Sequence, residues 1–343
     1  MISSVKKKKI FLTGITGFLG KHIALELKKQ GYNVVALIRD NNTPALLKDH
    51  HVEYCLGELL HPQTYMKYLK ECDIVIHAAA IASFGLKDSK QYYKVNAGGT
   101  KLLCEAAAKN GIKRFIHAST RGVLSVAKIP EKSDEQVGYK KLAEMDDYVR
   151  SKFEGEKEVL HIASQGDMEC IVLSPTALVG SCDDKPTPIG RIILTFLEGK
   201  TRAYMRGGIN LIDVEDAAKA FVTAVEKGKS GQVYIIGNKN IQLYDMFKVL
   251  GSISGVSLPK IKIPFWFAYI AAMVLEKISL IMGRQPLATA QKVLSLSKNY
   301  SYCTSQKAVE ELGLNQFPIQ NALEKSVNWY YGNTFKRRSS TKF

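Results

Sequence analysis

The chain has 343 residues, of which 46% are hydrophobic and 23% charged, and this composition excludes a disordered protein. Lys and Arg number 48 against 32 Asp and Glu, for a formal charge of +16, which raises nucleic acid or an anionic membrane as partners. Eight of the excess charges lie at the two ends of the chain (Lys6 to Lys9, Lys336, Arg337, Arg338 and Lys342). Because no nucleic-acid-binding module accompanies them, we expect no nucleic-acid partner.

Short apolar runs alternate with amphipathic stretches over the first half of the chain. The helical patterns at 19–30 and 99–110 are each followed by a glycine, Gly31 and Gly111, which suits a helix C-terminus. The apolar runs are almost continuous, as strands covered on both faces require, and they lie at 10–13, 34–38, 74–79, 115–119 and 170–173. This repeated order predicts an α/β fold with a doubly wound parallel sheet.

The segment TGITGFLG lies between the first predicted strand and the first predicted helix. Its glycines permit a tight turn and let the backbone approach a pyrophosphate, which would face the free N–H groups of the helix N-terminus. Such glycines alone are frequent in surface turns, but here the strand, the helix and Gly31 supply the expected context. The pattern predicts a dinucleotide-binding (Rossmann) domain. We expect the cofactor to be contacted by Gly14, Thr16, Gly17, Phe18, Leu19 and Gly20.

The second predicted strand ends at Arg39 and Asp40, where the chain would meet the adenosine ribose. An arginine there can pair with a 2′-phosphate, whereas an acidic side chain accepts a hydrogen bond from a free 2′-hydroxyl. Because Arg39 comes first after the strand, we expect NADP(H) to be favoured over NAD(H). The alternatives are that Asp40 turns toward the ribose or that Arg39 is simply a solvated surface charge.

A candidate acid–base site follows the strand that ends in Ser119 and Thr120. Tyr148 and Lys152 stand four residues apart, which places both on one face of a helix. A phenol titrates near pH 10 and is a poor base at neutral pH until a nearby cation stabilises the phenolate. Lys152 can supply that cation, and a hydroxyl at the strand end can hydrogen-bond the substrate oxygen.

The spacing Tyr-x-x-x-Lys occurs a second time, at Tyr244 and Lys248, so spacing alone cannot select the site. Ligands bind at the carboxyl ends of the strands in such folds, and Tyr244 lies after the last predicted sheet strand. We therefore interpret Tyr244 as a packing residue and Tyr148 as the candidate general acid/base.

The pattern changes after residue 180. A loop with Pro and Asp at 181–188 precedes a helical run at 189–197, a strand candidate lies at 233–236, and helical patterns dominate from about residue 255. We assign 1–180 to the dinucleotide-binding domain and expect 205–240 to return to it. A smaller, mostly helical substrate lobe would comprise 181–204 and 241–335, followed by a flexible basic tail at 336–343.

The stretch from residue 263 to residue 275 contains no charge and has apolar residues at helical spacing. It is too short to span a bilayer, and Glu276 and Lys277 interrupt its continuation. One interpretation is a core helix of the substrate lobe. The other is a peripheral membrane contact through 263–283, or a portal for an apolar substrate, helped by the basic termini.

The six cysteines are scattered singly, without histidines at metal-ligand spacing, and lie at 55, 72, 104, 170, 182 and 303. The pattern predicts buried free thiols in a reducing compartment and no metal site. The apolar run after the first lysines has only three residues, too few for a signal peptide. We expect a cytoplasmic protein, with the inner face of a membrane as the alternative location.

Taken together, these motifs resemble the extended short-chain dehydrogenase/reductases of the NAD-dependent epimerase/dehydratase superfamily. The resemblance covers residues 10 to about 240. Within the superfamily, the chain is similar in particular to the branch of dihydroflavonol reductases and 3-beta-hydroxysteroid dehydrogenases. The motifs that carry it are TGITGFLG at 13–20, HAAA at 77–80, VNAGGT at 95–100, Tyr148 with Ser151 and Lys152, SPT at 174–176, and LIDVED at 211–216.

The resemblance implies roles for particular residues. Tyr148 would be the general acid/base, Lys152 the group that adjusts its pKa, and Thr120 the hydroxyl partner, with Ser119 in its place if the register differs by one. Asn96 would be structural or would hydrogen-bond the cofactor. Ser174 stands where many sugar-nucleotide enzymes carry Arg, and Glu58 where Asp is frequent. Further cofactor contacts would come from Glu58, Leu59, Ala78, Ala79, Ala80, Lys152, Pro175 and Thr176.

The leading hypothesis is an NADP(H)-dependent oxidoreductase that interconverts a ketone and a secondary alcohol on an apolar, ring-bearing or lipid-like small molecule. A nucleotide-sugar epimerase or dehydratase that retains NAD is the first alternative, and Arg39 and Ser174 count against it. A non-catalytic NAD(P)-sensing module is the second, and it would not need Tyr148, Lys152 and Thr120 together. The oligomeric state is left open, with a homodimer as one expectation.

Overall fold

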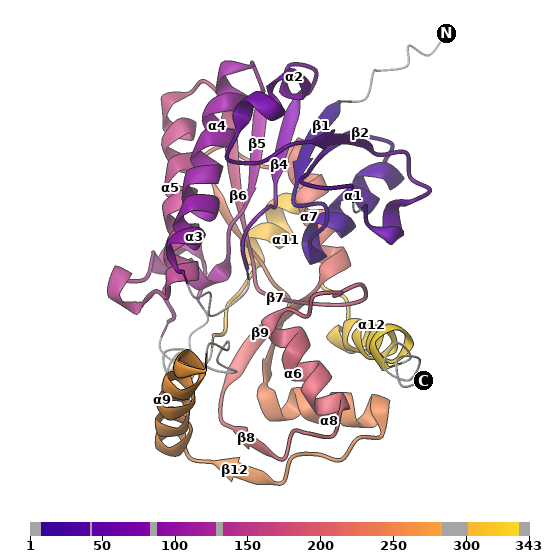
Figure 1. The fold of residues 1–343 in the computed structure, drawn as a ribbon, viewed down its shortest axis with the longest axis vertical. Helices are drawn as coiled ribbons and strands as arrows, with labels where there is room; N and C mark the ends of the chain where they lie inside the picture. Colours follow the sequence, from indigo (N-terminus) through magenta and orange to yellow (C-terminus); the bar gives the residue numbers. More distant parts are fainter. Residues whose placement is uncertain (1–7, 42, 83–87, 128–132, 283–300, 336–343) are drawn as a thin grey trace.

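A computed structural model describes residues 8–41, 43–82, 88–127, 133–282 and 301–335 (Figure 1). Its centre is a seven-stranded sheet in the order β10-β6-β5-β4-β1-β2-β3, with every neighbouring pair parallel. The strands are β1 (Lys9–Thr13), β2 (Asn33–Ile38), β3 (Glu53–Leu56), β4 (Ile74–His77), β5 (Arg114–Ala118), β6 (Glu169–Pro175) and β10 (Val233–Ile236). The predicted doubly wound α/β fold is confirmed.

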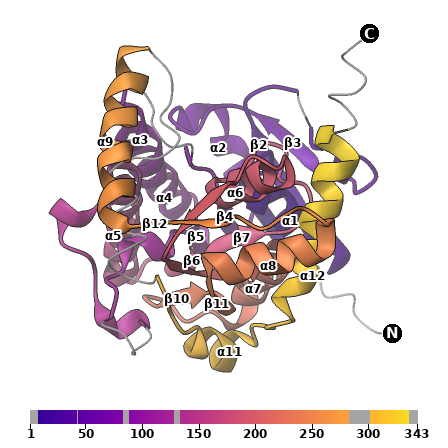
Figure 2. The ribbon, with the colours of Figure 1, turned by 90° about the horizontal axis from the view of Figure 1, so that it is seen from below.

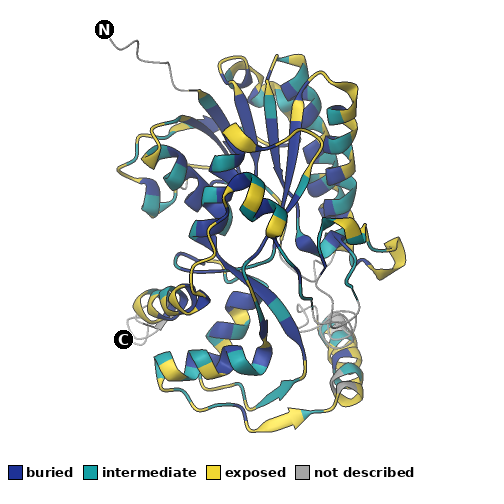
Figure 3. Ribbon diagram, turned by 180° about the vertical axis from the view of Figure 1, so that it is seen from behind, coloured by how far each residue is buried: buried dark blue, intermediate teal, exposed yellow. Residues whose placement is uncertain are grey.

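Each face of the sheet is covered by helices, which explains the nearly continuous apolar runs of its strands. On one face, α1 (Phe18–Lys29), α7 (Val214–Lys227) and α11 (Gln306–Leu312) share a buried cluster with Ile10, Leu12 and Ile116. On the other, α4 (Thr100–Lys109) and α5 (Asp147–Gln165) pack on Phe11, Val75 and Phe115. Figure 3 shows the central strands as buried along most of their length.

The local sequence predicts the helix ends of this domain but not its edge strand. Gly31 and Gly111 both have φ of 77°, in the left-handed region that suits a glycine after a helix. β3 was not predicted, because Cys55 is its only buried side chain and four residues give no clear pattern. Short helices α2 (Met66–Leu69) and α3 (Lys90–Tyr92) complete this domain, with a π-helical turn at Tyr93–Gly99 between α3 and α4.

A smaller lobe lies beyond the carboxyl ends of the sheet strands (Figures 1 and 2). One buried cluster joins its helices α6 (Pro188–Leu197), α8 (Leu243–Ser254) and α12 (Ile319–Tyr330). Its strands form a three-stranded sheet of β7 (Ala177–Val179), β9 (Gly208–Asp213) and β11 (Lys239–Gln242), and a pair of β8 (Ala203–Met205) and β12 (Ile261–Ile263). Within residues 205–240, α7 and β10 thus join the large domain, whereas β9 and β11 belong to the small lobe.

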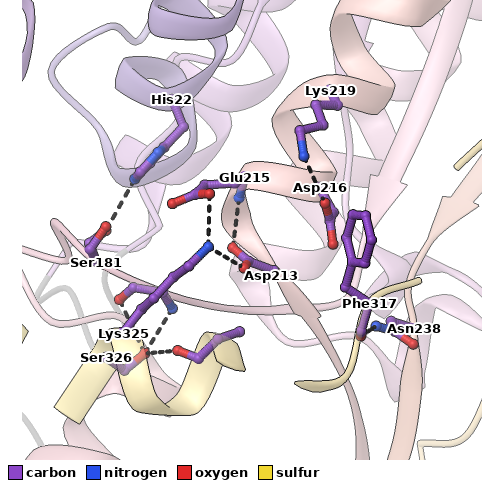
Figure 4. Close-up of polar contacts among 12 residues, drawn as sticks. His22, Ser181, Asp213, Glu215, Asp216, Lys219, Asn238, Phe317, Lys325 and Ser326 are labelled. Atoms are coloured by element: carbon purple, nitrogen blue, oxygen red, sulfur yellow. Dashed lines mark hydrogen bonds and ion pairs between the residues drawn. The ribbon is translucent and has the colours of Figure 1, made fainter. Parts of the chain in front are cut away.

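The LIDVED motif connects the two parts of the molecule (Figure 4). The Asp213 carboxylate accepts a hydrogen bond from the Glu215 backbone N–H at 2.9 Å and thereby caps α7. Lys325 on α12 donates to Asp213 at 3.0 Å and to Glu215 at 2.8 Å. Nearby, Nε2 of His22 on α1 lies 3.0 Å from the Ser181 carbonyl oxygen. The motif that signals the family therefore fastens the small lobe to the large domain.

The apolar stretch after β12 forms α9 (Phe265–Ile281). Of the α9 side chains that the structure describes, only Ala272 is buried, so its interpretation as a core helix is wrong. No helix in the described part of the chain is long and apolar enough to cross a membrane. Residue 283, the first seven residues and the basic tail at 336–343 lie outside the described residues.

All six cysteines are free and buried, which confirms the predicted state of these side chains. Burial raises the pKa of the Cys55 thiol to about 11 and of the Cys72 thiol to about 12. These thiols are therefore protonated at neutral pH and act as small apolar core residues.

Candidate active site

The glycine turn packs directly against the end of β4. Gly14 has φ of 81°, and a Cβ at this position would lie 2.5 Å from backbone atoms of Ala78 and Ala79. A Cβ on Gly20 would overlap the Gly14 carbonyl group. Gly17 precedes α1, whose first turn of Phe18, Leu19 and Gly20 carries no charge. The turn therefore leaves an uncovered helix N-terminus that suits an anionic pyrophosphate.

Gly20→Ala should weaken nicotinamide-cofactor binding at least tenfold and lower the free energy of unfolding by about 1–3 kcal/mol, because the added methyl group forces the turn to move. The measurements are a fluorescence titration with the reduced cofactor and a urea unfolding curve. Gly98→Ala is the matched control, since its Cβ would meet only the Tyr93 carbonyl oxygen at 3.7 Å. Equal affinities of the Gly20→Ala variant and the wild type would contradict this role of the turn.

The predicted adenosine-binding residues follow β2 and β3. Arg39 and Glu58 are exposed at the ends of these adjacent strands, and the Gly57 backbone N–H donates to the Ile38 carbonyl oxygen at 2.9 Å. Leu59 is buried, and a Cβ on Gly99 would lie 2.7 Å from its side chain. The exposed side chains of Arg39 and Glu58 thus lie at one edge of the sheet, next to the buried Leu59.

Asn96 holds the segment after β4 against α5. Its Oδ1 accepts from the Ile81 N–H at 2.8 Å, and its Nδ2 donates to the Ile81 carbonyl oxygen at 3.1 Å and to Ser151 Oγ at 3.0 Å. Ser151 in turn donates to the Tyr148 carbonyl oxygen at 2.7 Å. Of the two roles open for Asn96, these contacts support the structural one. Ala78 and Ala79, half-buried, and the exposed Ala80 lie on the segment it holds.

Tyr148 lies in the first turn of α5 and is hydrogen-bonded to the Thr120 side chain. The helix starts here because the Asp146 carboxylate accepts from the Val149 N–H at 2.8 Å. Burial, and then the Asp146 charge, raise the pKa of Tyr148 to about 12, and the Tyr92 side chain adds a smaller increase. The Thr120 hydrogen bond acts in the opposite direction and lowers this pKa. The phenol is therefore protonated at neutral pH.

Thr120 and Ser119 have different partners. Ser119 donates a short hydrogen bond to the buried Glu156 carboxylate, whereas Thr120 contacts Tyr148 and accepts from the Gly122 N–H at 3.2 Å. The structure thus brings Thr120, and not the fallback residue Ser119, to the tyrosine.

Lys152 is buried one turn farther along α5, with 2% of its surface exposed. Its Nζ lies 3.4 Å from Nε2 of His117 on β5. Burial lowers the pKa of Lys152 to about 8, although the Glu156 carboxylate raises it. Burial also raises the pKa of Glu156. The hydrogen bonds from Ser119 and Tyr139, and next the Lys152 charge, act in the opposite direction and lower this pKa. The ammonium group thus has a neutral imidazole beside it and is attracted by the charge of the Glu156 carboxylate.

Two buried histidines beneath Lys152 were not predicted as part of the site. His77 Nε2 lies 2.9 Å from Thr100 Oγ1, whose own proton goes to the Asn96 carbonyl oxygen at 2.6 Å, so Nε2 carries the imidazole proton. Its Nδ1 then accepts from Thr13 at 2.7 Å. Burial, and next the Lys152 charge, lower the pKa of His77 to about 3 and that of His117 well below its usual value.

A signal for these histidines existed in the sequence. Each is a polar residue within a largely apolar strand run, and the two occupy paired positions on β4 and β5, with ring centroids 5.3 Å apart. Only the strand register brings them together, and one sequence does not supply it.

The end of β6 completes the site. The Thr176 N–H donates to the Ile236 carbonyl oxygen at 3.0 Å, next to the buried Pro175. Within the described residues, the buried hydroxyls of Ser174 and Thr176 and Nδ1 of His117 have no hydrogen-bond partner. Buried hydroxyls without partners are costly, and a polar ligand such as a nicotinamide dinucleotide would satisfy the ones near the strand ends.

All the predicted site residues follow the carboxyl ends of β1 to β6 or lie in the first two turns of α5. The strand order reverses between β1 and β4, and ligands of open α/β sheets bind at such a reversal. The glycine turn and the free hydroxyls therefore fit a dinucleotide, and Tyr148, Thr120 and Lys152 fit acid–base chemistry beside it. The fold and the site define a dinucleotide-dependent α/β enzyme.

The sequence model of the NAD dependent epimerase/dehydratase family matches residues 10–237, and the chain belongs to this family. A putative dihydroflavonol 4-reductase of Synechocystis sp. is 36% identical, with 93% of this chain and 94% of that protein covered. Sterol demethylase protein B of Methylococcus capsulatus is 26% identical, with coverage of 93% and 97%. The resemblance expected from the motifs is confirmed, and the protein is an NAD(P)-dependent enzyme.

Solved structures agree with this assignment. The crystal structure of gox2253 is 30% identical and superposes with a TM-score of 0.84, over 95% of this chain and 98% of that one. A nucleoside-diphosphate-sugar epimerase from Pseudomonas aeruginosa is 21% identical, with a TM-score of 0.78 over 96% and 99%. At that identity the second match shows the fold alone.

Proposed function

We propose that the protein is an NADP(H)-dependent oxidoreductase that interconverts a ketone and a secondary alcohol on an apolar, ring-bearing or lipid-like molecule. The observation that carries the proposal is the Tyr148 phenol, hydrogen-bonded to Thr120 at the carboxyl edge of the sheet with Lys152 one turn away. Relatives support the substrate class: one is named a sterol-4-alpha-carboxylate 3-dehydrogenase in Dictyostelium discoideum, and one a farnesyl-dihydroquinoline-oxide ketoreductase in Stigmatella aurantiaca.

A bound nicotinamide cofactor supplies or takes up the hydride. In reduction, Tyr148 gives its proton to the substrate oxygen, and in oxidation it takes the proton from the alcohol. Because the pKa of the phenol is about 12, the residue is ready as a proton donor at neutral pH. Thr120 donates its hydroxyl hydrogen toward the oxygen that becomes negative, and Lys152 places a positive charge one turn away.

The position of Lys152 supports a role beside the one expected from the sequence. Its ammonium group lies against His117, and the charges that shift the pKa of Tyr148 come from Asp146 and Tyr92. We propose that Lys152 holds a cationic site for the cofactor and the reacting oxygen, with Glu156 and His117 fixing its position.

Arg39→Ala should raise KM for NADP(H) by about 10- to 100-fold, which is the effect of losing a charge-assisted hydrogen bond, and leave KM for NAD(H) unchanged. Steady-state kinetics with both cofactors measure this preference. Lys29→Ala, which removes an exposed cation from the far end of α1, is the control for a general loss of positive charge. A preference that does not change in the Arg39→Ala variant would remove Arg39 from cofactor selection.

The substrate class is tested by nicotinamide absorbance with both cofactors over ketosteroids, dihydroflavonols, beta-keto lipids and nucleotide sugars. We expect cofactor-coupled turnover with at least one apolar ketone or alcohol. Turnover confined to nucleotide sugars would overturn the apolar assignment.

A nucleotide-sugar epimerase is the second candidate, since UDP-glucose 4-epimerase of Vibrio cholerae is 25% identical, with 76% of this chain and 80% of that protein covered. In that reaction the cofactor is regenerated in each cycle, so absorbance stays constant while product forms. Separation of the sugar products by chromatography distinguishes the two candidates.

A further inference from the structure

The region from β12 through α9 exposes an unusual amount of apolar surface. Nine of the fifteen large hydrophobic side chains exposed in the described part of the chain lie between residues 261 and 282. Trp266 is 63% exposed, Ile270 49% and Val274 51%, and these three are four residues apart on one face of α9. Isolated exposed apolar residues are normal, but a contiguous apolar patch of this kind marks an interaction surface.

Positive charge surrounds this surface. The β8–β12 pair leads directly into α9 (Figure 1), and it is flanked or occupied by four exposed cations, Arg202, Arg206, Lys260 and Lys262. Within the described segments 200–206 and 260–282, Glu276 is the only acidic residue. Tyr204 stacks inward on Tyr244 at 4.4 Å, while Ile261, 62% exposed, extends the apolar surface onto the strand pair.

An apolar helix beside a basic strand pair has the composition of a surface that lies on an anionic bilayer. Such helices bury their apolar side chains in the headgroup region, and adjacent Lys and Arg are attracted to acidic lipids. A soluble protein partner would need an acidic rim around an apolar groove. An anionic bilayer instead supplies acidic headgroups and an apolar interior over any area. The tryptophan near the start of α9 also suits the membrane interface.

We propose that α9 and the β8–β12 pair form a membrane-binding surface that places the protein on bilayers containing acidic phospholipids. The helix lies in the interface and does not cross the bilayer. Figures 1 and 2 place α9 on the same side of the molecule as α3 and α5, which carry Tyr92 and Tyr148. The proposal goes beyond the proposed reaction and holds whichever substrate the enzyme uses.

The test is flotation of the full chain with vesicles of phosphatidylcholine alone or of equimolar phosphatidylcholine and phosphatidylglycerol. We expect flotation with the anionic vesicles, and its loss in the variant Trp266→Ser, Ile270→Ser, Val274→Ser. The variant Arg202→Gln, Lys260→Gln, Lys262→Gln should lower partitioning by on the order of 100-fold. Thermal unfolding confirms that each variant is folded.

Matched controls separate this surface from exposed apolar groups and cations elsewhere on the protein. Leu56→Ser with Leu142→Ser removes exposed apolar groups elsewhere, and Lys70→Gln, Lys109→Gln, Lys113→Gln removes exposed cations elsewhere. Both controls should float like the wild type. In a Trp329→Phe background, brominated lipid should quench the fluorescence of Trp266.

Three results would overturn the proposal. The first is the absence of flotation with anionic vesicles, and the second is equal loss of flotation in the control variants. The third is a wild-type dimer, detected by light scattering, that becomes a monomer in the Trp266→Ser, Ile270→Ser, Val274→Ser variant, while neither the dimer nor the monomer binds vesicles. A second copy of the chain would then cover α9.

Discussion

Tyr148→Phe should lower kcat by about 10²- to 10⁴-fold, the range that general acid–base catalysis contributes, while cofactor affinity stays within about twofold, a change that is small in free energy. The reason is geometric: the phenol oxygen is the group hydrogen-bonded to Thr120, whereas the ring, which packs edge-on at 6.2 Å from Tyr92, is retained in phenylalanine. Stopped-flow hydride transfer and a cofactor titration measure the two quantities separately.

The chain provides its own control for this experiment. Tyr244 and Lys248 repeat the Tyr-x-x-x-Lys spacing, but Tyr244 stacks on Tyr204 and Lys248 lies 5.1 Å from the Tyr244 ring centroid. Tyr244→Phe should therefore leave kcat unchanged. If Tyr148→Phe turned over substrate at the rate of the wild type, the acid–base assignment would be wrong.

Lys152→Met should remove activity and at the same time stabilise the folded protein at neutral pH. Burial lowers the pKa of Lys152 from 10.5 to about 8 in the folded state, so the unfolded chain binds the proton more tightly. The cost of keeping this lysine is therefore fully present below pH 8 and is relieved as the pH rises toward 10.5. A shift of this size corresponds to about 3 kcal/mol, of which we expect the variant to recover about 1–3 kcal/mol.

Urea unfolding of the wild type and of Lys152→Met at pH 7 and near pH 10 checks the sign. The stability difference should be largest at pH 7 and should shrink at the higher pH. Lys248→Met, at an exposed position, should show neither the gain in stability nor the loss of activity. A Lys152→Met variant less stable than the wild type at pH 7 would show that the electrostatic attraction between Lys152 and Glu156 outweighs the cost of burial.

These two experiments concern one arrangement that the sequence predicted only in part. Lys152 and Glu156 are one turn apart on α5. Lys152 lies beside His117 on β5, and Glu156 accepts from Ser119, the residue directly after β5. Helical and strand periodicities can each be predicted from sequence, but the register between a helix and a strand depends on tertiary packing. The pair Tyr148 and Lys152 was therefore predictable, whereas their neighbours His117 and Glu156 were not.

The choice between Thr120 and Ser119 was undetermined for the same reason. Side chains alternate along a strand, so the two hydroxyls turn to different neighbours, and the pattern of one chain does not say which faces Tyr148. The glycine turn, by contrast, was predictable from TGITGFLG because its requirements are local: a left-handed residue at Gly14 and a missing Cβ at Gly20.

α9 shows the limit of composition as a guide to burial. Its first eleven residues are uncharged and apolar around the whole circumference of the helix, which is the composition of a core helix, and the sequence gives no information about what covers them. β3 shows the opposite limit, because Glu53 and Leu56 are exposed at the sheet edge and no hydrophobic periodicity marks the strand.

The route of the chain between the two lobes has a consequence for how such an enzyme can change during evolution. The chain enters the small lobe after β6, returns at α7, leaves again after β10 and returns at α11 before ending with α12 in the small lobe. Neither lobe is one continuous stretch of sequence. A new small lobe therefore cannot be acquired by recombining a single gene segment, and its surface must change by substitutions within existing elements or by new loops at the strand ends.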